Sequence, residues 1–328
     1  MTQMTVLEAL GAAMAHEMAR DSDVVILGED VGTAGGIFRA TQGLQQRFRP
    51  ERVIDTPLDE KGIAAHAVGM ALYGLRPIAE IQFSGFIHDA FEQLMFGATK
   101  YRWMTGGQYS VPMVIRAPSF GGINGGFWHS QSPEAYYCHG GGMKIVVPST
   151  PQDAYGLLLA AIRDPDPTLV LEPVPLYRTL RGEVNDDGEA IGIGEAAIVR
   201  PGNDLTALSY GPMCHDVLAV AEQMAENPGY DIEVIDLRSL MPFDVDAITA
   251  SVQRTGRLVV VHEAPLSLGF GAELAATVQE RAFGYLHCPI GRVAAPDLPY
   301  GFSGGDEYYR PNKARIAAAI RRAMEFDF

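Results

Sequence analysis

The chain has 328 residues, a formal net charge of −15 and a hydrophobic content of 47%. This length is enough for two domains with hydrophobic cores of their own. An acidic chain repels nucleic-acid phosphates, and no apolar run approaches the roughly 20 residues that span a bilayer, so we expect neither a nucleic-acid partner nor a membrane span. The three cysteines, Cys138, Cys214 and Cys288, are far apart. They fit neither a disulfide framework nor a zinc site, which favours a reducing compartment.

The N-terminal segment is predicted to be a helix. Thr5 and Glu8 have the spacing of a capping box, and apolar residues recur at helical intervals up to Met18. Nothing before this helix resembles a targeting segment. We therefore expect a cytoplasmic protein, or a mitochondrial-matrix protein after import.

Short β-branched runs then alternate with longer helical patterns. The predicted strands are residues 24–27, 77–83, 112–116, 144–147 and 168–171. The predicted helices between them are residues 62–74, 87–103 and 151–163. This alternation predicts an α/β fold in which helices cover both faces of a parallel sheet.

A polar stretch from residue 181 to residue 188 interrupts the alternation and predicts a linker. We divide the chain into a domain of residues 1–180, a linker of residues 181–194 and a smaller domain of residues 195–328. The second domain is predicted to be doubly wound as well. Its expected strands are residues 205–209, 232–235 and 258–261, and its closing helix is residues 312–324.

One motif in the second domain matches chemistry that its context does not support. Residues 301–305 read G-F-S-G-G, as in the nucleophile elbow of a hydrolase. That elbow needs a strand before it and a histidine after it, whereas prolines precede this stretch and no histidine follows His287. We interpret it as a proline- and glycine-rich loop.

Three segments of the first domain carry groups suited to a binding site. Asp59 and Glu60 form an acidic pair where a loop enters a helix, although helix capping alone would explain them. Phe86 follows a predicted strand, and ligands of parallel sheets bind beyond the carboxyl ends of strands; core packing is the alternative. Residues 120–134 contain four glycines within six residues, followed by His129. Long glycine-rich loops in compact domains are usually functional.

Taken in order, these segments resemble the β subunit of the decarboxylase component of 2-oxo acid dehydrogenase complexes. The resemblance is carried by D-T-P-L-D-E at residues 55–60, G-L-R-P-I-A-E-I-Q-F at 74–83 and H-S-Q-S-P-E-A at 129–135. It continues through D-L-R at 236–238 and H-E-A-P at 262–265, and so covers nearly the whole chain. It implies a thiamine-pyrimidine-binding domain of transketolase type, followed by a transketolase C-terminal-like domain.

The resemblance also implies thiamine diphosphate as a cofactor shared with an α subunit. In the family, a G-D-G motif of the α subunit holds magnesium and the diphosphate, and this chain has no G-D-G. The aminopyrimidine is then expected to contact Leu58, Glu60, Gln82 and Phe86. Glu60 matches the catalytic glutamate that shares a proton with the pyrimidine, and burial beside Leu58 would raise its pKa. Phe86, a tyrosine in many relatives, would stack on the ring.

The remaining site residues are also implied by the resemblance. His129 matches a catalytic histidine that orients substrate or passes protons during acyl transfer, work that suits an imidazole. A potassium ion is implied near five residues: Met113, Ala161, Ile162, Asp164 and Asp166. Hard cations take such oxygen ligands, but Asp166 stands where asparagine is usual, and an Asp-Pro turn would also explain the segment.

The expected partners are the α subunit, in a heterotetramer of two α and two β subunits, and a lipoyl-bearing acyltransferase core. The C-terminal domain is expected to serve dimerisation and docking, without a catalytic residue. Residues 129–135 and 262–265 look like branched-chain (3-methyl-2-oxobutanoate) enzymes, and residues 292–297 like some pyruvate enzymes. We favour the branched-chain substrate over pyruvate or acetoin. A non-catalytic electron-transfer or assembly subunit is the rival, although scattered cysteines argue against an iron–sulfur cluster.

Overall fold

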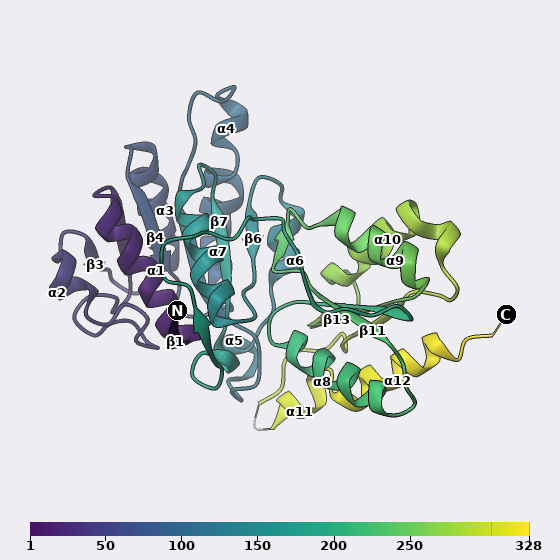
Figure 1. Ribbon diagram of the computed structural model, residues 1–328. Coiled ribbons are helices and arrows are strands. Elements are labelled where there is room, and N and C mark those ends of the chain that lie inside the picture. Colours follow the sequence, from purple (N-terminus) through teal and green to yellow (C-terminus); the bar gives the residue numbers. More distant parts are fainter. Residues whose placement is uncertain (303, 328) are drawn as a thin grey trace.

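The computed structural model describes residues 1–302 and 304–327 and forms two α/β domains side by side (Figure 1). The predicted α/β fold class is confirmed. Each domain has one main sheet with helices on both faces. None of the helices in the described ranges is long and apolar enough to cross a membrane.

The first domain is built on a seven-stranded sheet in the order β12-β6-β7-β5-β4-β2-β3, to which the second domain contributes β12 (Ser239–Met241). Its own strands are β2 (Val24–Gly28), β3 (Val53–Asp55), β4 (Arg76–Glu80), β5 (Val114–Ser119), β6 (Lys144–Val146) and β7 (Thr168–Pro173). These six strands are parallel, with Leu27 opposite Ala79 and Ile115 opposite Leu169. Both faces are covered, which explains why the strands read as continuous apolar runs.

Helices α1 (Val6–Arg20) and α7 (Pro151–Arg163) pack together on one face of this sheet, and α3 (Glu60–Leu72) lies on the other. The capping box at the start of α1 is confirmed: Glu8 N–H donates to Thr5 Oγ1 at 3.1 Å, and Thr5 N–H donates to Glu8 Oε2 at 2.8 Å. The shorter helices are α2 (Leu44–Phe48), α4 (Tyr101–Met104), α5 (Gly126–His129) and α6 (Glu134–His139).

The single helix predicted over residues 87–103 is wrong. The structure has a 3₁₀ turn η1 (Ile87–Ala90), a π-helical turn η2 (Gln93–Ala98) and then α4. Thr99 N–H donates to the carbonyl five residues back, Leu94 O, at 3.1 Å, while the Thr99 hydroxyl donates to Met95 O at 2.9 Å. These local bonds compete with the α-helical ladder and divide the segment.

The predicted linker of residues 181–194 needs correction at its start. Residues Arg181–Val184 form β8, which pairs antiparallel with β1 (Thr2–Thr5) in a two-stranded sheet. Farther along, Ile191 N–H donates to Gly156 O on α7 at 3.1 Å. The partner of β8 lies at the opposite end of the domain sequence, so local polarity could not reveal this strand.

The second domain has a five-stranded sheet in the order β14-β13-β10-β11-β9. Its strands are β9 (Ala197–Arg200), β10 (Leu205–Ser209), β11 (Ile232–Asp236), β13 (Leu258–Pro265) and β14 (Gly291–Ala295). Helices α9 (Val245–Thr255) and α10 (Phe270–Ala282) cover one face, and α8 (Met213–Glu226) and α12 (Lys313–Met324) cover the other (Figure 1). The segment before α12 contains α11 (Gly305–Tyr309), and 3₁₀ turns η3 (Val174–Leu176) and η4 (Phe283–Tyr285) complete the elements.

The two domains are joined by more than their connection in sequence. Strand β12 (Ser239–Met241) leaves the second domain and pairs antiparallel with β6 at the edge of the first sheet. Arg238, just before it, forms an ion pair with the buried Asp153 of α7 at 2.9 Å. One hydrophobic cluster also runs through both domains. The second domain is therefore held firmly against the edge of the first.

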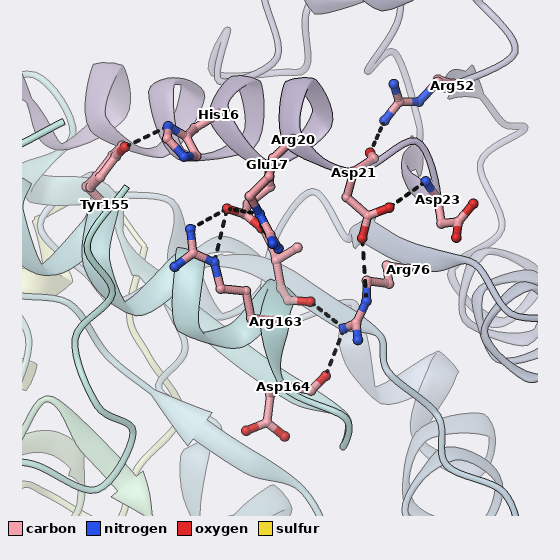
Figure 2. Close-up of polar contacts among 11 residues, drawn as sticks. His16, Glu17, Arg20, Asp21, Asp23, Arg52, Arg76, Tyr155, Arg163 and Asp164 are labelled. Atoms are coloured by element: carbon pink, nitrogen blue, oxygen red, sulfur yellow. Dashed lines mark hydrogen bonds and ion pairs between the residues drawn. The ribbon is translucent and has the colours of Figure 1, made fainter. Parts of the chain in front are cut away.

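A buried carboxylate fastens α1 to α7. The Glu17 side chain has no exposed surface and accepts hydrogen bonds from Arg163 Nη2 and Arg20 Nη2, each at 2.6 Å (Figure 2). Burial raises the pKa of Glu17, but bonds and charges from the two arginines outweigh it, so the pKa lies below its ordinary value of 4.5. The resulting stabilisation is present above that ordinary pKa and is lost as pH falls through the lower, folded pKa.

We expect Glu17→Gln to lower the free energy of unfolding by about 1–3 kcal/mol at pH 7, because the charge-assisted bonds to Arg20 and Arg163 are weakened. At pH 3 the loss should shrink, since protonation already weakens the wild-type contacts. Urea unfolding at both pH values measures the difference. Glu222→Gln, at an exposed site on α8, is the matched control. An equal loss at both pH values would contradict the role of the Glu17 charge.

Candidate functional site

Glu60 is the first residue of α3 and lies near the carboxyl ends of the parallel strands of the first sheet. The preceding Asp59 is exposed and caps the helix, because its Oδ1 accepts a hydrogen bond from Gly62 N–H at 2.9 Å. Asp59 therefore caps the helix, and the half-buried Glu60 carboxylate is free to make other contacts. The partial positive charge of a helix N-terminus favours a carboxylate at this position.

A second carboxylate beside Glu60 was missed from the sequence. Glu29 follows directly after β2 and is half-buried. Burial raises the pKa of Glu29, and the negative charges of Asp30 and Glu60 raise it further. Glu29 and Glu60 therefore lie close enough to interact. The sequence could have indicated Glu29 as a site residue, because it follows the carboxyl end of a predicted parallel strand.

The structure brings two separately predicted residues together, Phe86 and His129. The ring of His129 meets Phe83 edge-on at 4.5 Å between centroids and meets Phe86 edge-on at 5.4 Å. Trp128 stacks on Phe86, with centroids 6.1 Å apart and an interplanar angle of 18°. Phe83 and Trp128 were not predicted as site residues, although each adjoins one that was. A further flat group would have to use the remaining face of Phe86 or displace Trp128.

The other two predicted contacts, Gln82 and Leu58, lie at the surface of this region. Gln82 is half-buried, and its side-chain amide has no hydrogen-bond partner within the described ranges. Leu58 is 70% exposed. Leu58 therefore does not bury Glu60 in the isolated chain, although the sequence predicted that it would. Leu58 instead leaves apolar surface beside Glu60, where another surface can cover it.

A buried ionic cluster underlies the site and was also missed from the sequence. Arg116 of β5 has no exposed surface; its Nη1 contacts Glu80 Oε2 and its Nε contacts Glu172 Oε1, both at 2.6 Å. The Tyr177 hydroxyl donates to Glu172 Oε2. Burial raises the pKa of Glu80, Arg116 opposes this, and Glu172 adds to it. The cluster ties together the carboxyl ends of β4, β5 and β7, from which the site loops emerge.

The residues of the predicted potassium site do not fit a cation as they stand. Arg76 Nη1 donates to the carbonyl oxygen of Ile162 at 2.8 Å. It also donates to the carbonyl oxygen of Asp164 at 3.3 Å (Figure 2). The Asp164 carboxylate pairs with Lys144 at 2.6 Å, and the Asp166 carboxylate pairs with Arg102 at 2.5 Å.

One more oxygen of the potassium prediction is also engaged, since Met113 O accepts a hydrogen bond from Thr168 N–H at 3.0 Å. Positive side chains thus occupy the place that the prediction gives to potassium. Across residues 1–302 and 304–327, no three histidine, cysteine or acidic side chains gather in an arrangement that could hold a metal ion.

Comparison with known proteins agrees with this architecture. Residues 2–179 match the transketolase pyrimidine binding domain, and residues 194–316 match the transketolase C-terminal domain. The chain is 44% identical over 326 residues to the pyruvate dehydrogenase E1 component subunit beta of Staphylococcus epidermidis, covering 99% of this chain and 100% of that relative. It is 45% identical over 340 residues to the 2-oxoisovalerate dehydrogenase subunit beta of Pseudomonas aeruginosa, covering 99% and 96%.

Among solved structures, a split gene transketolase described as an inactive beta4 tetramer has a similar fold. Its TM-score is 0.80 at 22% sequence identity, and the match covers 98% of this chain and 99% of the other. At that identity the likeness concerns the fold alone.

Proposed function

This chain belongs to the β subunits of the E1 component of 2-oxo acid dehydrogenases, and we propose that it acts with an α subunit in thiamine-diphosphate-dependent oxidative decarboxylation. The observation that carries the proposal is the half-buried Glu60 carboxylate at the start of α3, at the sheet edge that also presents Phe86 and His129. When bound, the cofactor supplies the carbon nucleophile and the electron sink for decarboxylation.

The groups of this chain suit the aminopyrimidine end of that cofactor. Glu60 offers a carboxyl that can hold and exchange a proton with a ring nitrogen. Gln82 offers an amide without a partner in the described chain, and Phe86 offers an aromatic surface. Leu58, which is exposed in this chain, would cover the ring once a second subunit closes the site.

The diphosphate end requires a different set of groups, which we assign to the α subunit. The cofactor's phosphates are anionic, and the neighbouring Glu29 and Glu60 would repel them. In the proposed assembly of two α and two β subunits, magnesium and the diphosphate are held by the G-D-G motif of the α subunit. Leu58 and Trp128, 70% and 49% exposed in this chain, would face that partner.

His129 is proposed to act after decarboxylation, when the acyl group passes to the lipoyl group of an acyltransferase core. Its Nδ1 lies 3.2 Å from Gly125 O. If Nδ1–H donates to that carbonyl, Nε2 is the nitrogen free to accept a proton. Phe83 and Phe86 fix the orientation of the ring from two sides.

For the substrate we propose a branched-chain 2-oxo acid of the 3-methyl-2-oxobutanoate type, with pyruvate or acetoin as the alternative. The proposal rests on the motifs at residues 129–135 and 262–265, since relatives of both kinds are similarly identical to this chain. Co-expression with an α subunit and assay against a panel of 2-oxo acids tests it. Higher kcat/KM for pyruvate would overturn the substrate assignment, and no turnover of any 2-oxo acid would overturn the function. We further propose a cytoplasmic location.

The isolated chain is expected to bind thiamine diphosphate more weakly than about 1 μM, because it lacks the diphosphate and magnesium ligands. Calorimetric titration with the cofactor and magnesium measures this, first for the chain alone and then after the α subunit is added. Binding at micromolar or tighter affinity, about −8 kcal/mol or better, should appear in the second titration. The same affinity in the first titration would show that one chain completes the site.

A further inference from the structure

The loop that precedes His129 has an unusual backbone. This segment, residues 120–126, is called the glycine loop below. Phe120 and Asn124 have φ values of 74° and 55°, in the left-handed region that residues other than glycine rarely adopt. Gly122 and Gly126 also have positive φ values, 95° and 65°. Such a conformation persists when surrounding contacts hold it.

The contacts that hold the glycine loop come from the C-terminal domain. Glu263 of β13 accepts a hydrogen bond from Gly121 N–H through Oε1. Asp306 of α11 accepts two through one oxygen, Oδ2: from Gly122 N–H at 2.6 Å and from Asn124 N–H at 2.9 Å. Three backbone donors of the loop thus end on two carboxylates. Both carboxylates are buried, with Glu263 1% and Asp306 8% exposed.

Each of these carboxylates is built into the second domain in its own way. Arg310 Nε contacts the other oxygen of Glu263 at 2.8 Å. Burial raises the pKa of Glu263, while Arg310 and the Gly121 N–H oppose that rise. Asp306 is fixed by the short helix α11, and Gly304 N–H, just before that helix, donates to Asn124 Oδ1 at 3.2 Å. Hydrogen bonds to charged acceptors are about twice as strong as neutral ones.

The glycines of the loop are required by the close approach of the second domain. A Cβ on Gly121 would collide with the Tyr300 hydroxyl, and one on Gly126 would collide with the Phe302 ring. Phe302 also packs edge-on against Phe127, with 5.2 Å between the ring centroids. The loop therefore fits the second domain closely along its length.

The glycine loop leads directly to the His129 ring. Helix α5 is a single turn that begins at Gly126 and ends at His129. His129 Nδ1 is bonded to Gly125 O, and a Cβ on Gly125 would lie 2.7 Å from the Cβ of His129. At the base of the loop, Gln131 O accepts a hydrogen bond from Phe120 N–H at 3.2 Å. A shift of the loop therefore moves the imidazole.

We propose that Glu263 and Asp306 are positioning residues, which act through the glycine loop to hold His129 in place for the acyl-transfer step. The catalytic consequence rests on the proposed function; the control of loop conformation does not. The C-terminal domain thus contributes to the reaction as well as to assembly. A displaced imidazole loses alignment with the group that it protonates, and misplacement of about 1 Å costs up to about a hundredfold in rate.

The test uses the assembled enzyme of this chain and its α subunit. In Asp306→Ala, kcat for reductive acylation of a lipoyl domain should fall about tenfold with KM nearly unchanged, because loop alignment is lost while binding groups remain. Asp306→Asn keeps an acceptor oxygen and should recover most of the rate. Glu307→Ala, at the exposed neighbouring position of α11, is the matched control and should behave as wild type.

Combining Asp306→Ala with His129→Ala decides whether Asp306 acts through His129. If it does, the double variant will be no slower than His129→Ala alone, since no imidazole is left to misplace. Losses that multiply in full would overturn the proposal.

Hydrogen exchange of residues 118–132 in the assembled enzyme provides a measure that does not depend on catalysis. Asp306→Ala should exchange these amides about tenfold faster than wild type, because opening of the loop then breaks two fewer bonds. Glu263→Gln, which preserves shape, should show a smaller increase at Gly121, and it serves if Asp306→Ala does not fold. Unchanged exchange in both variants would overturn the proposal. An inactive wild type with faster exchange in Asp306→Ala would refute the proposed function but not the control of the loop.

Discussion

Glu60→Gln is expected to lower the rate of decarboxylation by about 10²–10⁴-fold while the fold and the assembly survive. Glutamine has the size of glutamate but cannot hold and release a proton at a ring nitrogen in the same way. Glu60 begins α3 and does not cap it, so the substitution leaves the helix start intact. Decarboxylation is measured with an artificial electron acceptor in the assembled enzyme, and folding is measured by thermal unfolding.

The neighbouring Asp59→Asn variant is a sharp control for this experiment. It removes one carboxylate charge from the same turn, yet asparagine is as good an N-cap as aspartate. Because Asp59 is exposed and bonded to Gly62 N–H, we expect activity and stability close to wild type. A large loss in Asp59→Asn would show that the general acidity of this turn matters more than the Glu60 carboxyl.

A second measurement separates cofactor activation from later chemistry. Exchange of the cofactor's acidic thiazolium proton with solvent reports activation before any substrate binds. We expect Glu60→Gln to slow this exchange along with decarboxylation. Exchange at the wild-type rate in a variant that has lost decarboxylation would remove Glu60 from the activating role.

The fold was predictable from the sequence wherever one local pattern decided it. Residues 24–27 are a continuous apolar run, as strands buried on both faces are, and they form most of β2. Strands β8 and β12 were missed because their partners, β1 and β6, lie far away in the sequence. Residues 87–103 form separate helical turns because of hydrogen bonds of Thr99, and the periodicity of apolar residues in the sequence does not reveal these bonds.

The candidate site was predictable to the extent that motifs mark it. Glu60, Phe86 and His129 came from three separate segments, and the structure places Phe86 and His129 in contact. Arg116 was missed because a charge inside a strand looks exposed until its partners are known. Asp306 follows a stretch interpreted as a loop, and its contact with residues more than 180 positions away becomes visible only in the folded chain.

His129→Ala is expected to reduce acyl transfer to a lipoyl domain by about 10²-fold, and decarboxylation with an artificial acceptor by less than about tenfold. The imidazole is held by two phenyl rings and by Gly125 O, an arrangement that fixes which nitrogen faces away from the loop. Neither Glu60 nor Gln82, which are assigned to the aminopyrimidine, forms a hydrogen bond with this ring in the described chain, where the His129 ring is bonded to Gly125 O. Loss of the imidazole should therefore spare the earlier step.

His66→Ala is the matched control for that variant. His66 Nδ1 is bonded to the carbonyl four residues earlier, Gly62 O, at 2.7 Å, just as His129 is bonded to Gly125 O, but His66 is exposed on α3. It should lose the same kind of bond without loss of either activity. If His129→Ala lowered both activities equally, His129 would be acting on substrate position before carbon dioxide leaves. Selective loss of acyl transfer would place its proton transfer after that step, because only then does the acyl group meet the lipoyl sulfur.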